Sequence, residues 1–280
     1  MIREQAPAKV NLSLHITGIR EDGYHLMHMV NFSVPGLSDV LDFEPAPELE
    51  LACDAAGVPS GKDNLVYRAM ALLKKTCRVD CGVKVTLEKH IPMQAGLAGG
   101  SSDAAAVLRG LNRLWKLGLS EQQLIPLAAA IGADVPYCLV SQPAVVTGIG
   151  EKIERLGAFP NFAILGVKPA VDVATPEAFR EMDQIQRHKP YDDRALRAAL
   201  RRQDFDQLSR CCCNDFEQIV FKKHPEVEAI GSAMREAGAW MARMSGSGST
   251  MIGYFKTAEQ AETAAARFKS PQNIVFTAEI

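Results

Sequence analysis

The chain has 280 residues, which favours one large domain or two modest ones, and its net charge of −2 argues against a basic nucleic-acid-binding surface. A hydrophobic content of 47% and a charged content of 23% are ordinary for a soluble globular protein. Seven cysteines, three of them consecutive at 211–213, suit reduced thiols better than a disulfide framework. With no signal peptide and no run of about 18 apolar residues, we expect a cytoplasmic protein without membrane partners.

The N-terminal segment 6–16 alternates polar and apolar residues, which predicts a strand with one buried face. Lys9 and Asn11 then project from one face, either as a solvated surface or as part of a site. Asp22-Gly23 predicts a tight turn, and Tyr24 and His25 follow it directly. From the residues alone, Tyr24 is a packing residue, as an aromatic after a hairpin turn usually is. His25 and His28 form a His-x-x-His pair, but a metal site is disfavoured because no further carboxylate or cysteine ligands cluster with them.

Segments 31–51 are short apolar stretches broken by Pro35-Gly36 and similar signals, which predicts several strands and turns of an antiparallel sheet. A loop over 54–63 precedes Asn64, which is expected to cap a helix.

The glycine-rich stretch 92–103 lies between a predicted strand at 83–87 and a predicted helix that carries apolar residues from 104 to 115 and stops near Gly118. Its sequence matches neither a Walker A loop nor a dinucleotide fingerprint. Glycines let a backbone approach a ligand closely, and free N–H groups at a helix start attract anions, so we expect a phosphate cradle, although a plain tight turn has the same pattern. Ser101, Ser102 or Asp103 is expected to cap the helix.

A capping box at 120–123 predicts a helix that ends at Gly132. Asp134 lies two residues further on, and a turn-forming and a catalytic role fit it equally well. Glycines at 148 and 150 predict a turn near the site, and a domain boundary is expected at 150–160, giving domains 1–155 and 156–280.

The second half predicts a strand at 162–167, helices near 177–183, across 192–222 and at 225–237, and then two strands around the serine-glycine loop 245–250. A helix at 258–268 and a strand at 273–278 complete a β–α–β–β–α–β order, which indicates a ferredoxin-like half.

Three stretches in this order resemble the motifs of the GHMP kinases, the family of galactokinase, homoserine kinase and mevalonate kinase. They are Pro7-Ala-Lys-Val-Asn-Leu, Pro92 to Ala105, and Met244-Ser-Gly-Ser-Gly-Ser-Thr. The resemblance spans nearly the whole chain. It implies an α+β fold of two domains, with a ribosomal-S5-domain-2-like half, the ferredoxin-like half, and an active site in the cleft between them.

The resemblance also assigns roles to residues. Lys9 and Asp134 would be catalytic, with Asp134 taking the substrate's hydroxyl proton and Lys9 near the transferred phosphoryl group. The substrate would contact Asn11, Tyr24, His25, Asp134, Thr175 and Phe179, with Tyr24 and His25 reading a cytosine ring. The ATP site would comprise Pro92, Met93, Gln94, Ala95, Gly96, Leu97, Ala98, Gly99, Gly100, Ser101 and Ser102, with Asn64 and Lys89 near the adenine.

Asp22-Gly-Tyr-His and Gly132-Ala-Asp-Val-Pro-Tyr resemble motifs of one branch of the family. This resemblance implies phosphorylation of the 2-hydroxyl of 4-diphosphocytidyl-2-C-methyl-D-erythritol in non-mevalonate isoprenoid biosynthesis. ATP is the implied donor, and Mg²⁺ is expected with it, without an assigned protein ligand. The implied partner is a small molecule carrying a cytidine diphosphate, bound by a monomer or weak homodimer. Another kinase of the family, a non-catalytic nucleotide-binding regulator and an RNA-binding protein are the rival interpretations.

Overall fold

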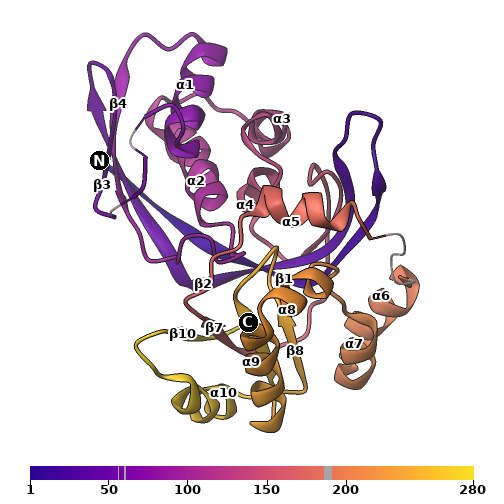
Figure 1. The fold of residues 1–280 in the computed structure, drawn as a ribbon. Helices are drawn as coiled ribbons and strands as arrows, with labels where there is room; N and C mark the ends of the chain where they lie inside the picture. The colour runs from indigo at the N-terminus through magenta and orange to yellow at the C-terminus, as the bar shows by residue number, and fades with distance from the viewer. Residues whose placement is uncertain (56, 60, 186–190) are drawn as a thin grey trace.

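The computed structural model describes residues 1–55, 57–59, 61–185 and 191–280, which form two sheets with helices packed on each (Figure 1). The first sheet has the order β3-β4-β2-β5-β6, with β1 paired to β2, and the second has the order β10-β7-β9-β8. Two halves of mixed helices and strands confirm the predicted α+β class. The strands are β1 (Ile2–Ile19), β2 (His25–Ala46), β3 (Leu49–Cys53), β4 (Gly82–Glu88), β5 (Ala144–Gly148), β6 (Lys152–Arg155), β7 (Ala163–Lys168), β8 (Met241–Met244), β9 (Met251–Phe255) and β10 (Ile274–Glu279).

The described residues of the first half form four helices: α1 (Leu65–Cys77), α2 (Gly99–Leu114), α3 (Glu121–Ile131) and α4 (Val135–Val140). The predicted cap of α1 is confirmed, because the Asn64 side chain accepts a hydrogen bond from the Val66 N–H. The capping box of α3 at Ser120 and Gln123 is confirmed as well, and Gly132 is its C-cap.

The predicted start and end of α2 were wrong. The helix begins at Gly99, and its N-cap is Ala98 in a left-handed backbone conformation without a side-chain cap. Serine and aspartate at 101–103 are therefore inside the helix and do not cap it. At the other end the helix stops at Leu114, four residues before Gly118, where Trp115 becomes the C-cap.

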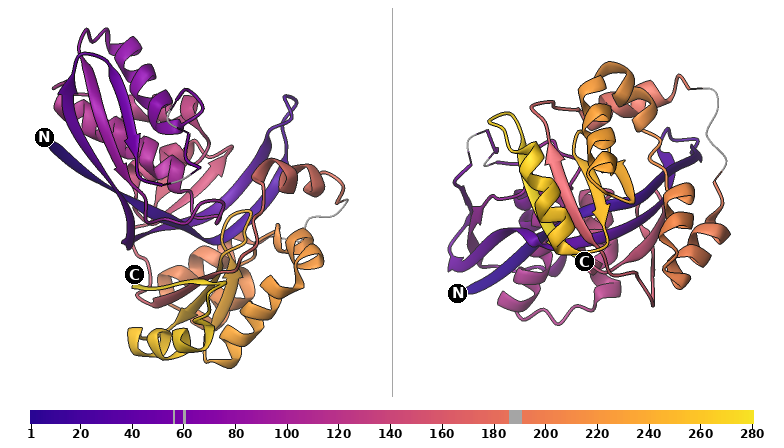
Figure 2. Two further views of the ribbon diagram at one scale, coloured as in Figure 1. Left: turned by 60° about the vertical axis from the view of Figure 1, so that its left-hand side comes forward. Right: turned by 90° about the horizontal axis from the view of Figure 1, so that it is seen from below.

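The strands β1 and β2 are longer than predicted and run between the two halves, ending in a hairpin that stands apart from the first helices (Figure 2). The strand β2 continues through Pro35-Gly36, because residues 35–37 form an irregularity between the pairs Ala8↔Val34 and Pro7↔Ser38. Predicting several short strands there was wrong. The prediction of one buried face for β1 was also wrong, because both faces are buried over 8–15, where the second half covers the strand.

The second sheet is antiparallel throughout, and its order places its third strand beside its first, as in a ferredoxin-like fold. The region 192–222 forms three short helices, because Gln203 takes a left-handed conformation and residues 212–216 leave the helical path to contact β1. The helices of this half are α5 (Thr175–Met182), α6 (Asp193–Arg202), α7 (Phe205–Cys211), α8 (Glu217–Lys223), α9 (Pro225–Glu236) and α10 (Ala258–Ala265).

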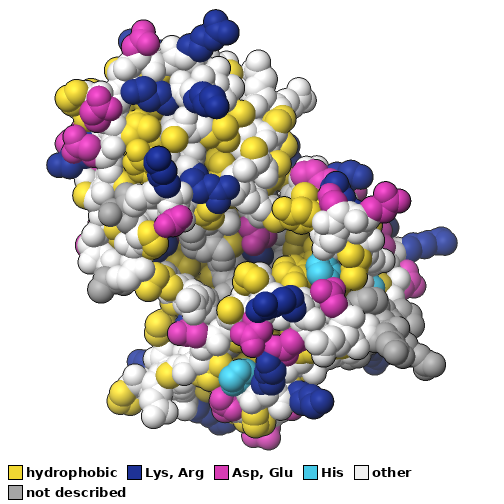
Figure 3. Space-filling view, turned by 45° about the horizontal axis from the view of Figure 1, so that its top comes forward, with side chains coloured by type: hydrophobic (Ala, Val, Ile, Leu, Met, Phe, Trp, Pro, Cys, Tyr) yellow, Lys and Arg dark blue, Asp and Glu magenta, His cyan; other side chains and the backbone are white. Residues whose placement is uncertain are grey.

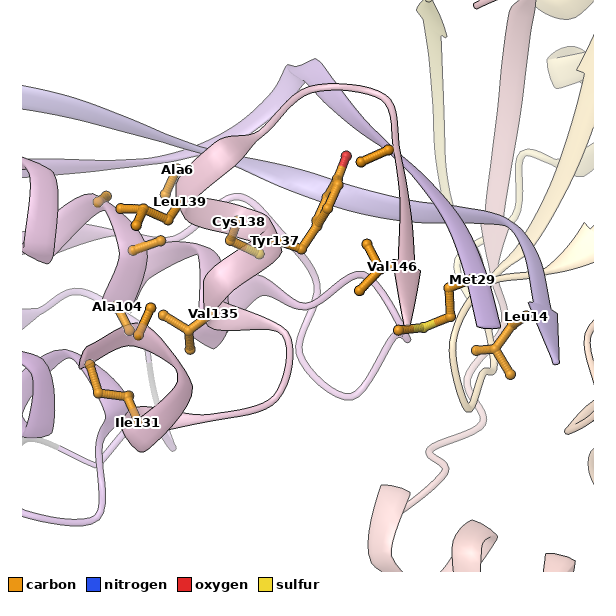
Figure 4. Close-up of a cluster of buried hydrophobic side chains, with 14 of the residues drawn as sticks. Ala6, Leu14, Met29, Ala104, Ile131, Val135, Tyr137, Cys138, Leu139 and Val146 are labelled. Atoms are coloured by element: carbon orange, nitrogen blue, oxygen red, sulfur yellow. The ribbon is translucent and has the colours of Figure 1, made fainter. Parts of the chain in front are cut away.

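The core of the first half forms where α2, α3 and α4 meet the sheet. Figure 4 shows Val135 of α4 beside Ala104 and Ile131, with Tyr137 directed toward the strand that carries Val146. Each of these side chains is almost fully buried, so α4 and the residue that precedes it are held in place by packing. None of the helices described is both long and apolar enough to cross a membrane.

The second half is joined to β1 by backbone hydrogen bonds and a buried ion pair. The Leu14 N–H donates to the Cys213 carbonyl at 2.7 Å, and the Asp215 N–H donates to the Leu14 carbonyl at 3.1 Å. His15 Nδ1 lies 2.8 Å from Asp215 Oδ2, and the His15 ring stacks on Tyr191. Burial lowers the pKa of His15, but hydrogen bonds to Asp215 and Cys213 outweigh burial and raise the pKa to about 9.

This ion pair predicts a pH-dependent stability. Because the pKa of His15 is higher in the folded chain than its ordinary value of 6.5, its contribution is complete below about pH 6.5 and is lost as the pH rises through 9. We expect a loss of about 1–2 kcal/mol in the free energy of unfolding, since partial access of water reduces the full value. Urea unfolding at pH 6 and pH 9 measures it. An Asp215→Asn variant, which keeps an oxygen for the Ile16 N–H, should show a smaller difference, and an unchanged difference would contradict the assignment.

Candidate active site

A pocket of about 420 Å³ lies between the two halves. Figure 3 shows this face hollowed where the halves meet, with hydrophobic side chains along the hollow. The lining comes from the β1–β2 strands, the start of α1, the loop before α2, the residues just before α4 and α8, Ile149, the helix α5 and the loop 245–250. Of the predicted site residues it includes Lys9, Lys89, Pro92, Met93, Gln94, Ala95, Gly96, Leu97, Ala98, Gly99, Gly100, Ser101, Asp134, Thr175 and Phe179.

The glycine-rich loop 92–98 leads into the N-terminus of α2 at the pocket wall. Its shape needs left-handed backbone at Gln94, Gly96 and Ala98, and the Lys9 N–H donates to the Leu97 carbonyl at 3.0 Å. The first N–H groups of α2 have no partners inside the helix, and the helix dipole favours negative charge there. An added methyl group at Gly100 would meet only Leu65, at 3.8 Å, so this position leaves open space for a ligand. The loop and helix start together offer a site for phosphate.

The third motif, loop 245–250, packs directly against this loop. Ser245 Oγ donates to the Gly96 carbonyl at 2.9 Å. A methyl group on Gly96 would lie 2.0 Å from the Ser245 carbonyl oxygen, so only glycine permits this approach. Ser247 Oγ lies 2.8 Å from Thr175 Oγ1, which connects the same loop to the start of α5. The two loops therefore form one wall of the pocket.

The two residues predicted to be catalytic lie together at the pocket. Lys9 Nζ is 3.3 Å from Asp134 Oδ1, and the Lys9 side chain is 4% exposed while that of Asp134 is 37% exposed. Asp134 immediately precedes α4, and its carboxylate makes no capping hydrogen bond. A buried ammonium thus faces an accessible carboxylate, which can accept a proton from a bound hydroxyl.

A second buried lysine lies below the loop, and its environment was not foreseen. Lys89 Nζ forms ion pairs with Asp39 and with Asp103, the latter at 2.8 Å. Burial lowers the pKa of Lys89, but the two carboxylates outweigh burial and raise it, while burial raises the pKa of Asp103. Asp39 also accepts hydrogen bonds from the His90 and Ile91 N–H groups, so this cluster holds the start of the loop.

Aromatic side chains form the part of the pocket near the hairpin. Phe179 lines the pocket, contacts the His25 ring at 4.6 Å between centroids, and meets Phe216 edge-on at 4.9 Å. His25 Nε2 lies 2.7 Å from Asp183 Oδ1. Tyr24 is 59% exposed at the hairpin, next to His25. This arrangement offers flat apolar faces for a planar ring.

Five predicted site residues do not line the pocket: Asn11, Tyr24, His25, Asn64 and Ser102. Asn11 is buried behind Lys9, and Ser102 is buried with its hydroxyl donating to the Pro7 carbonyl at 2.7 Å. The structure also places Gly246 and Ser247 of the third motif in the wall. It adds residues that the sequence did not single out as site residues: Leu14, Met27, Met29, Leu65, Ile91, Ala133, Ile149 and Phe216.

The residues present fit a magnesium ion carried by a nucleotide. Within the described part of the chain, Asp134 is the single carboxylate that lines the pocket, and the Ser101 hydroxyl group lies in the same lining. Mg²⁺ in nucleotide sites keeps several waters and takes one or two protein oxygens besides the phosphates. This donor set is adequate for that mode of binding.

Two family descriptions match the chain: residues 64–142 match the GHMP kinases N terminal domain, and residues 196–273 match the GHMP kinases C terminal domain. A protein of Exiguobacterium sibiricum named 4-diphosphocytidyl-2-C-methyl-D-erythritol kinase is 42% identical over 89% of this chain and 87% of its own length. One of the same name from Pelotomaculum thermopropionicum is 41% identical over 96% of this chain and 94% of its own.

Solved structures give the same result for the fold. A crystal structure of 4-(cytidine 5'-diphospho)-2C-methyl-D-erythritol kinase superposes with a TM-score of 0.84 and 33% identity, covering 99% of this chain and 98% of the other. A homoserine kinase of Cytophaga hutchinsonii superposes with a TM-score of 0.79 and 19% identity, over 99% of this chain and 94% of its own, which supports the fold alone. The chain therefore belongs to the GHMP kinase family, and it is similar over nearly its full length to relatives named 4-diphosphocytidyl-2-C-methyl-D-erythritol kinase.

Proposed function

We propose that this chain transfers the γ-phosphoryl group of ATP to the 2-hydroxyl of 4-diphosphocytidyl-2-C-methyl-D-erythritol, giving the 2-phosphate and ADP. The observation that carries the proposal is the Lys9–Asp134 pair, 3.3 Å apart, beside a glycine-rich helix start in one pocket. The names of the relatives supply the acceptor. The seven unpaired cysteines fit a reducing compartment, and we place the reaction in the cytoplasm.

The residues divide the work of the reaction between them. The loop 92–98 and the start of α2 bind the triphosphate through backbone N–H groups and the helix dipole. Asp134 accepts the proton of the substrate's 2-hydroxyl group. The hydroxyl oxygen then bonds to the γ-phosphorus, while the bond between that phosphorus and the bridging oxygen breaks and ADP leaves. Lys9, whose ammonium lies 3.3 Å from the Asp134 carboxylate, offsets negative charge on the transferring group.

Magnesium is part of the proposal, and the Ser101 hydroxyl in the pocket lining is the protein oxygen that would hold it or one of its waters. When bound, Mg²⁺ supplies positive charge to the phosphates. We further propose that Asn64 and Lys89 lie near the adenine, and that Tyr24, His25, Thr175 and Phe179 hold the cytidine. The domain limits 1–155 and 156–280, and a monomer or weak homodimer, are proposed on the same basis.

The deciding experiment compares acceptors. Purified protein with ATP and Mg²⁺ is assayed for ADP release with the cytidine-diphosphate methylerythritol, with mevalonate and with homoserine. We expect turnover with the first and at least a hundredfold lower kcat/KM with the others, because neither carries a base for the aromatic pocket. Preference for mevalonate or homoserine would overturn the acceptor assignment. Nucleotide binding without turnover of any of the three would favour a non-catalytic regulator.

Tyr24 gives a prediction about the base. Stacking of a base on an aromatic ring contributes about 1–3 kcal/mol, so Tyr24→Ala should raise KM for the cytidine substrate about tenfold or more. KM for ATP should stay within about twofold, because Tyr24 lies at the hairpin and outside the loop 92–98. Tyr24→Phe keeps the ring and is the matched control. Equal losses for both substrates in the alanine variant would remove Tyr24 from the base site.

A further inference from the structure

The side chain of Asn11 has an orientation that its donors determine. Its amide oxygen accepts from Lys9 Nζ at 3.0 Å and from the Gly246 N–H at 2.9 Å. Both partners can only donate, so the oxygen, and not the nitrogen, must face them. Asn11 is 1% exposed, and this single oxygen therefore joins the lysine of the first motif to the loop of the third.

The other end of the Asn11 amide must then donate. Asn11 Nδ2 lies 2.6 Å from Asn31 Oδ1 and 3.4 Å from Met29 Sδ. A thioether is a weak acceptor, so Asn31 supplies the main one. Asn31 stands directly opposite Asn11 in the β1–β2 ladder, and the register shifts just beyond that pair, between Asn11 and Ser13. The donor and the acceptor of each hydrogen bond from Lys9 through Asn11 to Asn31 are therefore determined.

The buried position of Asn31 costs folding free energy. It is fully buried, and its Nδ2 group finds no hydrogen-bond partner within the part of the chain that the structure describes. A buried amide group without a partner destabilises a fold, whereas an apolar side chain of the same shape would not. Asn31 thus does one thing that leucine cannot do: it gives the Asn11 amide an acceptor.

We propose that Asn31 is a positioning residue for phosphoryl transfer. By accepting a hydrogen bond from the Asn11 amide nitrogen, it holds the Asn11 amide oxygen against the Lys9 ammonium and the Gly246 N–H, and so keeps the ammonium beside Asp134. The inference rests on the proposed function, because it assigns Lys9 to the reaction. Asn31 does not line the pocket and acts through Asn11. Since displacements of about 1 Å in a catalytic group can cost about a hundredfold in rate, loss of this hold should appear in kcat.

The test uses three side chains of one shape. Asn31→Leu keeps the branched outline and removes the acceptor, while Asn31→Asp keeps an oxygen where Asn11 needs it. For the leucine variant we expect kcat about 10- to 100-fold lower, with KM for ATP and for the acceptor within about threefold. Its thermal midpoint should change little, because one unpartnered donor is removed on Asn31 while another is created on Asn11. The aspartate variant should recover at least tenfold of the loss.

A leucine variant with kcat within twofold of the unmodified chain would overturn the proposal. So would parallel losses in kcat, KM and thermal midpoint that aspartate does not rescue, because those indicate a structural role. If the leucine variant does not fold, Asn31→Ala, which also lacks an acceptor, is measured against the same expectations. The assay uses whichever alcohol the unmodified chain phosphorylates fastest, so a wrong acceptor assignment and a wrong role for Asn31 give different results.

Discussion

Replacing Asp134 by alanine is expected to lower kcat by about 10²- to 10⁴-fold, the range for loss of a general base. Asp134 can act as the base because its accessible carboxylate lines the pocket and lies 3.3 Å from the buried Lys9 ammonium. Nucleotide binding should survive, because the loop 92–98 and the start of α2 do not depend on this side chain. Stability should fall only modestly, since the carboxylate makes no capping hydrogen bond to α4 and its loss removes one partner of the buried Lys9. Steady-state kinetics, calorimetric titration with ADP and thermal unfolding measure the three effects.

The matched control is Asp134→Asn, which keeps the size and removes the basic oxygen. Its kcat should fall about as far as that of the alanine variant, because an amide cannot take a hydroxyl proton at neutral pH. Near-normal turnover in the asparagine variant would show that positioning by Lys9 and the loop suffices and that Asp134 is not the base. A loss of ADP binding in either variant would instead place Asp134 in nucleotide binding.

The elements that the sequence predicted well are those with strong local signals. Asn64, Ser120 with Gln123, and Gly132 mark helix ends through bonds within a few residues, and each marks the predicted end in the structure. The strand order of the second half was predictable because its apolar periods change cleanly from helix to strand, but the predicted helix across 192–222 was wrong, since the region divides into three helices. Errors arose where distant segments decide the outcome, as at Pro35-Gly36, where pairing with β1 keeps one long strand intact.

The site shows the same division. The sequence indicated the loop 92–98 because several unusual residues are adjacent. It could not indicate Asp39, because the burial of this carboxylate depends on a lysine 50 positions later. Phe216 and Asn31 carry no local signal either, since one is an apolar residue in a helical region and the other a polar residue in a strand. Their placement follows from β1 lying between the halves.

Replacing Gly96 by alanine is expected to cost about 2–4 kcal/mol in the free energy of unfolding and to weaken ADP binding at least tenfold. The new methyl group would lie 2.0 Å from the Ser245 carbonyl oxygen. The alanine would also have to adopt the backbone conformation at φ +70°, which is strained for an L-residue. The methyl group would meet backbone atoms of Ser245 and Gly248, so no flexible side chain can move aside. The loop 92–98 must separate from the loop 245–250, which opens the phosphate site.

Gly100→Ala is the matched control, since Gly100 belongs to the same glycine pair but lies inside α2. Its methyl group would meet only Leu65 at 3.8 Å, and alanine is a better helix former than glycine by about 0.5–1 kcal/mol, so this variant should be as stable as the unmodified chain or more so. Urea unfolding of both variants, with ADP titration of the Gly96 variant, separates the effects. The two substitutions should change the free energy of unfolding in opposite directions. Gly96 permits contact between two loops, whereas Gly100 leaves the start of α2 open to phosphate. If Gly96→Ala kept full stability and ADP affinity, the close approach of the two loops would not be what shapes the site.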